Sequence, residues 1–162
     1  MKRSIARGLA AGLAGTAAMT AWQELAARLK RHAVPRMLRE DEDPWERAPA
    51  PARLAKMVIE KVTGREVPVA RIPLLTNAVH WGYGTSLGAM YGLTANGRNP
   101  ALTGAAFGTG VWAFSYATLV PLGLYQWPWR YSAKTIAKDV SYHLVYGTGT
   151  AAAFAALERR RA

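Results

Sequence analysis

Charged residues are absent from four long stretches of this chain and are concentrated in the segments between them. The uncharged stretches are residues 8–23, 72–97, 99–129 and 140–157. Each is close to, or longer than, the roughly 17–25 residues with which a helix crosses a bilayer. We therefore predict an all-α integral membrane four-helix bundle, a single membrane domain covering residues 1–162. Its spans are expected at about 5–27, 72–95, 101–122 and 137–157.

The polar segment 30–71 is expected to carry a short amphipathic helix. Leu54, Met57 and Val58 recur at helical spacing, and basic and acidic side chains take most of the other positions. Gly64 is a suitable stop for this helix. Such a helix would lie on the membrane surface or over the bundle, and a partner-binding helix is the alternative.

Small residues recur at every fourth position in several of the uncharged stretches. Counting by four from His80 passes through three glycines, and counting by four from His143 passes through a glycine and two alanines. Because every fourth residue lies on the same side of a helix, such stripes let two backbones approach closely. The expected helix-packing residues are Gly8, Gly12, Gly84, Gly88, Gly92, Gly104, Gly108, Gly147 and Ala151.

An internal repeat links the second and fourth stretches. Residues 80–85 and 143–148 share the pattern H-x-x-Y-G-T. The match predicts two helical hairpins related as a parallel repeat. In that arrangement His80 and His143 lie at similar depth, and the second and fourth spans pack near each other.

The repeat also defines a candidate proton or ligand site, made of His80, His143, Asp139, Tyr83 and Tyr146. Asp139 precedes His143 by about one helical turn and could orient its ring. Two imidazoles can relay protons or bind a metal or haem. Histidines at a helix entrance also serve as plain hydrogen-bonding groups, and two ligands alone do not define a metal site.

Most other chemistry finds no support in the sequence. The chain has no cysteine, which excludes disulfides, thiolate metal sites and cysteine nucleophiles. It has no phosphate-binding loop, zinc-protease motif or dinucleotide fingerprint. We therefore expect a protein that is not an enzyme and that carries no metal site and no cofactor.

The net charge of +11 raises nucleic acid as a partner. The basic residues, however, flank the uncharged stretches, which fits lipid head groups better. The expected partners are the lipid bilayer and a second copy of the chain or another membrane protein, with no nucleic acid. Four aromatic residues beside Arg130 fit an interfacial belt, with base or ligand stacking as the alternative. They are Tyr125, Trp127, Trp129 and Tyr131.

Three segments resemble the YagU-like family of small bacterial inner-membrane proteins. They are the first span ending in Trp-Gln-Glu, the third span GAAFGTGVWAFSYATLVPLGL before Pro-Trp-Arg-Tyr, and the Asp-x-x-x-His-Leu-Val entry to a last span that ends Arg-rich. These are packing motifs that cover most of the chain, and the APAPA segment and the HWGYGTSLGAMYG stripe depart from the family pattern. The resemblance implies a multi-pass inner-membrane protein with cytoplasmic termini and a link to acid tolerance. It carries over no catalytic residue, and counting basic residues favours the long loop inside instead.

The sequence thus supports three functional hypotheses. The first is a non-enzymatic structural, accessory or oligomer-forming membrane protein packed through its Gly/Ala stripes. The second is a small transporter or proton-linked membrane protein of the acid-stress type that uses His80, Asp139 and His143. The third is a haem or metal binder.

Overall fold

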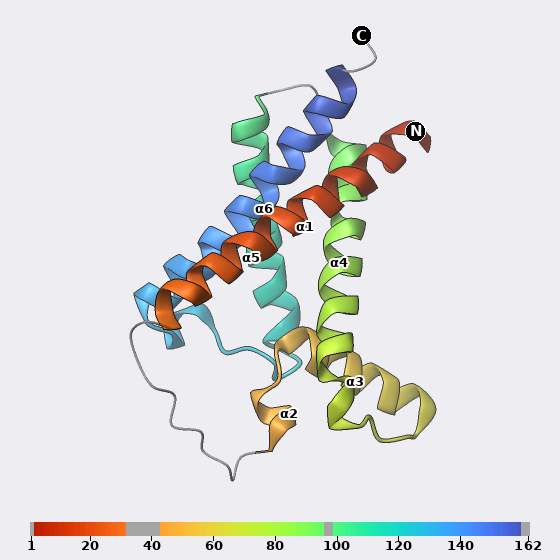
Figure 1. Ribbon diagram of the computed structural model, residues 1–162, viewed down its shortest axis with the longest axis vertical. Coiled ribbons are helices and arrows are strands. Elements are labelled where there is room, and N and C mark those ends of the chain that lie inside the picture. Colours follow the sequence, from red (N-terminus) through yellow and green to blue (C-terminus); the bar gives the residue numbers. More distant parts are fainter. Residues whose placement is uncertain (1, 32–42, 96–98, 160–162) are drawn as a thin grey trace.

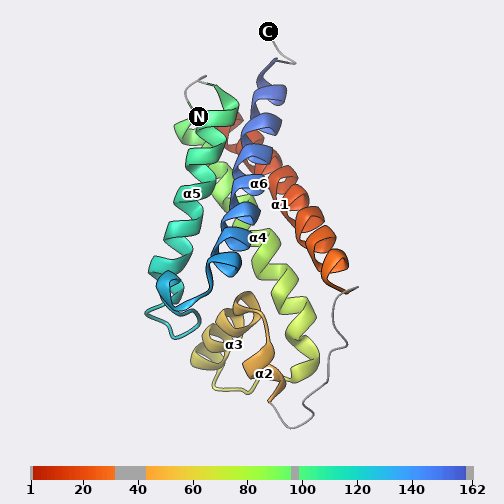
Figure 2. The same cartoon turned by 90° about the vertical axis from the view of Figure 1, so that its left-hand side faces the viewer.

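The computed structural model is all-helical and describes residues 2–31, 43–95 and 99–159. Its long helices are α1 (Lys2–Arg31), α4 (Ile72–Thr94), α5 (Pro100–Leu119) and α6 (Ala133–Arg159). Shorter elements are α2 (Pro44–Arg47), α3 (Ala50–Thr63) and the 3-10 turns η1 (Val69–Arg71) and η2 (Pro128–Arg130). The long helices form a bundle, and α2 and α3 gather at the end of the molecule away from both termini (Figure 1, Figure 2).

Local sequence signals set several of the helix ends. α5 begins just after Asn99, whose side-chain oxygen accepts a hydrogen bond from the backbone N–H of Ala101 at 2.9 Å. Pro100 occupies the first helical position, where its missing N–H costs nothing. α3 ends at Gly64, whose φ of 66° is a left-handed conformation that glycine adopts without strain.

The predicted membrane spans are wrong. Among residues 2–31, 43–95 and 99–159, no helix combines the length and the apolarity that crossing a bilayer requires. The four stretches lack charge, but Gly, Ala, Ser and Thr fill much of them, in place of the Leu, Ile, Val and Phe residues that drive insertion. Absence of charge was therefore an insufficient criterion. The integral membrane bundle, the multi-pass inner-membrane location and the cytoplasmic termini all depended on these spans and are corrected with them.

The long helices pack as three pairs: α1 on α4, α1 on α6, and α5 on α6. In Figure 1, α1 runs obliquely across the bundle while α4 and α5 run more nearly along it. α4 and α6, which the repeat predicts to pack against each other, meet only over a short length. The reason is that α1 presents small residues on two sides, with Gly8 and Gly12 against α4 and Gly15 against α6.

Glycines occupy the points where these helices cross. A Cβ atom placed on Gly12 would lie 2.7 Å from the carbonyl oxygen of Gly84 and 2.8 Å from the Cα of Gly88. A Cβ atom on Gly104 would lie 2.7 Å from the carbonyl oxygen of Gly147. Ordinary contacts between carbon atoms are about 3.5–4.0 Å long. The α1–α4 and α5–α6 pairs therefore bring backbone against backbone, and side chains larger than hydrogen do not fit at these positions.

The amphipathic helix α3 packs on the start of α4. Its Ala52 joins Trp45 and Val67 in a small core, and Ile72 and Leu75 of α4 rest against that core. This core holds α2, α3 and the returning segment 64–71 together as an end piece of the bundle. The exposed apolar side chains of α3 are Met57, Val58 and Val62.

Candidate functional site

His80 lies on α4 where this helix faces α1. Its Nε2 atom is 3.1 Å from the hydroxyl oxygen of Thr20 on α1. Burial lowers the pKa of His80 below its usual value of 6.5, and the neighbouring charge of His143 lowers that pKa further. The charge of His143 on α6 therefore acts on His80 on α4.

His143 is oriented by its own helix. Its Nδ1 atom is 2.9 Å from the backbone carbonyl oxygen of Asp139 and 3.9 Å from one carboxylate oxygen of the same residue. A carbonyl oxygen can only accept a hydrogen bond, so Nδ1 carries a proton and donates it.

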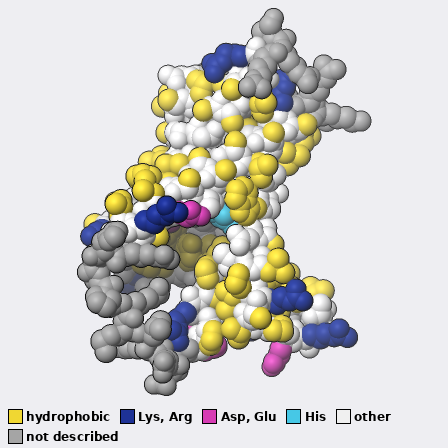
Figure 3. Space-filling view, viewed as in Figure 1, with side chains coloured by type: hydrophobic (Ala, Val, Ile, Leu, Met, Phe, Trp, Pro, Cys, Tyr) yellow, Lys and Arg dark blue, Asp and Glu magenta, His cyan; other side chains and the backbone are white. Residues whose placement is uncertain are grey.

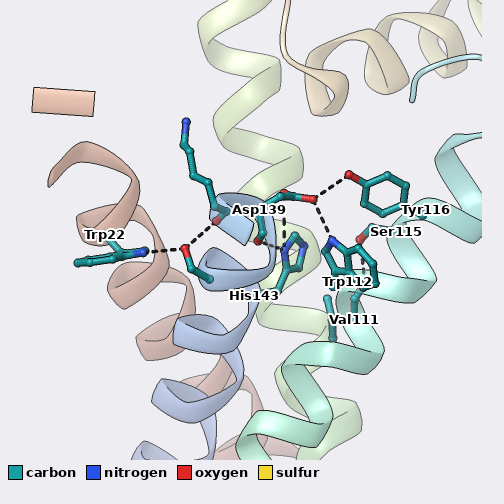
Figure 4. A network of polar contacts seen from close by, with 9 residues as sticks. Trp22, Val111, Trp112, Ser115, Tyr116, Asp139 and His143 are labelled. Carbon is teal, nitrogen blue, oxygen red and sulfur yellow. Dashed lines mark hydrogen bonds and ion pairs between the residues drawn. The ribbon is translucent and has the colours of Figure 1, made fainter. Parts of the chain in front are cut away.

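Asp139 ties α6 to α5 through its second carboxylate oxygen. That oxygen accepts hydrogen bonds from the indole N–H of Trp112 and from the hydroxyl of Tyr116, both at 3.0 Å (Figure 4). Burial, followed by the charge of Asp139 and its hydrogen bond, raises the pKa of Tyr116 well above its usual value of 10. Tyr116 therefore stays protonated and keeps donating. Two donors from α5 thus hold the Asp139 carboxyl at the α5–α6 contact.

A further contact joins α1 to this end of α6. The indole N–H of Trp22 donates to the hydroxyl of Ser141 at 3.0 Å, and that hydroxyl donates in turn to the carbonyl oxygen of Lys138 at 2.6 Å (Figure 4). The first turns of α6 are therefore bonded to both neighbouring helices.

The two tyrosines of the repeat have different environments. Tyr146 is buried, and its hydroxyl donates to the carbonyl oxygen of Gly84 at 2.7 Å, which is the local link between α6 and α4. Burial raises the pKa of Tyr146 to about 12. Tyr83 is 40% exposed, although partial burial still raises its pKa. The shared H-x-x-Y-G-T pattern thus does not give the two copies equivalent surroundings.

The predicted helix-packing residues lie at contacts within the chain. Gly8 and Gly12 of α1 face the glycines of α4, and the glycines of α5 face α6. The residues of α4 and α5 involved are Gly84, Gly88, Gly92, Gly104 and Gly108, and those of α6 are Gly147 and Ala151. These stripes are therefore occupied by intrachain packing and are not open for a second copy of the chain.

Three residues of the site were not predicted from the sequence: Thr20, Trp112 and Tyr116. The sequence did hold a signal for Trp112 and Tyr116. They are four positions apart on one side of α5 and are the kind of aromatic residue whose polar end needs a partner when buried. Thr20 offered no such signal, because threonines recur throughout the chain.

A metal ion bound by His80 and His143 would need further ligand side chains close by. Within the described residues, no three His, Asp or Glu side chains gather as a metal-binding group. His143 is hydrogen-bonded to Asp139 within α6, and His80 is hydrogen-bonded to Thr20 of α1. The aromatic belt residues Trp127 and Trp129 stack on each other at 5.0 Å between ring centroids and are 45% and 73% exposed.

Comparisons of the chain with family models, with curated proteins and with solved structures give no match. The resemblance to the YagU-like family stays a prediction, and the function is inferred from the site itself.

Proposed function

We propose that this chain is a non-enzymatic structural or accessory protein whose helix packing responds to protonation. The observation that carries the proposal is that His80 and His143 each lie at a contact between helices. His80 touches Thr20 of α1, and His143 is bonded to Asp139 where α6 meets α5. A change of charge at these two rings acts on the α1–α4 and α5–α6 contacts together.

The groups around His80 set the direction of the response. α6 contributes His143, with Asp139 beside it. α1 contributes the neutral Thr20, and Glu24 one turn further on is already in an ion pair with a basic side chain. α4 itself contributes Tyr83, and α5 contributes the neutral donors of the Asp139 network. The two imidazoles repel each other when both are protonated, and burial adds to that cost.

The sign of the pH dependence follows from the lowered pKa. A histidine in an unfolded chain has a pKa of about 6.5, whereas the folded chain holds His80 below this value. As the pH falls through 6.5, the unfolded state takes up its proton before the folded state does. The contribution of His80 to stability is therefore complete above pH 6.5 and is lost as the pH falls toward the lower, folded pKa.

Urea unfolding at a series of pH values between about 5 and 8 tests the proposal. We expect the free energy of unfolding of the wild-type chain to fall as the pH is lowered through this range. The His80→Gln/His143→Gln variant should lose most of that dependence. His32→Gln changes the remaining histidine of the chain and is the matched control. The same pH dependence in the wild type and the double variant would refute the proposal.

The structural or accessory part of the proposal is supported by apolar side chains left exposed on the long helices. They include Leu9, Leu13, Met90, Leu93, Leu102 and Phe114. Because the glycine stripes are used within the chain, an assembly would form through exposed side chains of this kind. Light scattering on the same samples measures the mass, and a mass of 17.6 kDa at every protein concentration would rule out an assembly of identical chains.

A further inference from the structure

Away from the two histidines of the repeat, a groove of about 510 Å³ lies between the end of α3 and the start of α4. Its volume is within the range of about 300–1,000 Å³ that is usual for small-molecule sites. The apolar part of its lining comes mainly from Ile59, Val67, Leu74 and Leu75, and its rim carries Arg65 and Arg71.

Hydrogen bonds fix one wall of this groove. The backbone N–H of Val67 donates to one carboxylate oxygen of Glu60 at 2.9 Å, and Lys56 donates to the other at 2.7 Å. Gly64 turns the chain in a left-handed conformation at the end of α3. Val67 is buried against Trp45 as a result. The segment that carries Arg65 is therefore anchored at both ends, and the groove exists without a ligand to shape it.

The charge around the groove favours an anion. The Glu60 carboxylate is already engaged on both oxygens, so Arg65 and Arg71 are opposed only by Glu66 among the charged residues of the lining. α4 continues directly from η1, whose turn already bonds the N–H groups of Arg71 and Ile72. The positive charge at the groove therefore comes from the two guanidinium groups.

The groove also exposes apolar surface. Leu74 is 54% exposed, and the neighbouring Val69 is 47% exposed. Figure 3 shows hydrophobic side chains gathered over this end of the molecule, with both basic and acidic side chains around them. A ligand that fits must therefore combine an anionic head with an apolar body.

We infer that the groove binds an amphipathic anion, namely a long-chain carboxylate of the fatty-acid type. The carboxylate lies at Arg65 and Arg71, where guanidinium groups can bind it in a bidentate manner. The hydrocarbon chain lies along Ile59, Leu74 and Leu75. This site is separate from the two histidines of the repeat, and it stands whether or not they respond to protons.

Isothermal titration of the full chain with dodecanoate, kept below its micelle concentration, tests the inference. We expect saturable binding to one site. The Arg65→Gln/Arg71→Gln variant should bind at least about tenfold more weakly, since each guanidinium supplies charge-assisted hydrogen bonds. Arg53→Gln also removes a positive charge from this end of the molecule, on α3 but outside the groove lining, and should bind like the wild type.

Two further arms complete the test. Leu74→Glu places a carboxylate at an exposed position of the lining, so it should abolish dodecanoate binding while circular dichroism stays unchanged. Dodecanol has the same chain without the charge and should bind at least about tenfold more weakly than dodecanoate. Unchanged binding in the double arginine variant, absence of saturable binding, or binding to anionic phospholipid vesicles but not to dodecanoate would each overturn the inference.

Discussion

The close approach of α5 and α6 can be tested with a pair of glycine-to-alanine changes on one helix. A Cβ atom on Gly104 would lie 2.7 Å from the Cα of Thr148 and 2.9 Å from the Cβ of Ala151, whereas a Cβ atom on Gly110 would meet nothing within 4 Å. Against a minimum comfortable carbon–carbon distance of about 3.5 Å, Gly104→Ala is too close by about 0.8 Å. The α5 and α6 backbones must separate to admit it.

The magnitude follows from comparing the two variants. Both gain about 1 kcal/mol because alanine favours a helix more than glycine does. Gly104→Ala alone also carries the cost of overpacking, about 1–3 kcal/mol. We therefore expect Gly104→Ala to be about 1–3 kcal/mol less stable than Gly110→Ala, with Gly110→Ala itself more stable than the wild type.

Urea unfolding followed by circular dichroism measures these differences, and thermal unfolding should separate the two melting temperatures by about 2–4 °C per kcal/mol. If Gly104→Ala proved as stable as Gly110→Ala, the backbones of α5 and α6 could not be in contact at this crossing, and the explanation given for the glycine stripes would be wrong.

Two further predictions concern tyrosines. Tyr146→Phe removes the hydroxyl that donates to the carbonyl oxygen of Gly84 at 2.7 Å, and it should lower the free energy of unfolding by about 0.5–1.5 kcal/mol at neutral pH. No loss in urea unfolding would show that this bond does not help to hold α4 and α6 together. Burial, and then the charges of Asp139 and Tyr131, raise the pKa of Tyr125 to about 12, so stability should fall as the pH rises above 10, where unfolded tyrosines ionise first. Absorbance near 295 nm should show a late-ionising component that Tyr125→Phe reduces, and complete ionisation of the native protein near pH 10 would contradict this.

The sequence was informative about helices and about close packing. The period-four stripe from His80 picks out Gly84, Gly88 and Gly92, and a Cβ atom on any of them would meet α1. Such a pattern is readable because only a helix repeats with nearly this period, and because glycine has few other uses inside one. The stripe did not show, however, which helix would pack against it. Any helix with a face of small residues is a candidate. The repeat predicted that α6 would pack against α4, but α1 packs there instead.

The candidate site was partly predictable for a similar reason. The pattern H-x-x-Y-G-T pointed to His80 and His143, and in the fold the charge of His143 lowers the pKa of His80. Trp112 and Tyr116 were not predicted, because their bonds to Asp139 depend on how α5 is rotated against α6. The membrane prediction failed because a stretch without charge was treated as an apolar one. Stretches rich in alanine, glycine and threonine carry no charge, but they are less apolar than a membrane span must be.

The position of α1 has a consequence for the order in which the chain folds. α5 and α6 are neighbours in sequence and can pair as soon as both have left the ribosome, because closing a short loop costs little entropy. α1 is synthesised first, yet Gly15 finds its partner only when Thr150 has been made. A glycine-rich helix has little stability of its own until it docks. Gly8 and Gly12 let α1 pair with α4 as soon as both helices are made, whereas its second contact, on α6, forms only after residue 150 has been added.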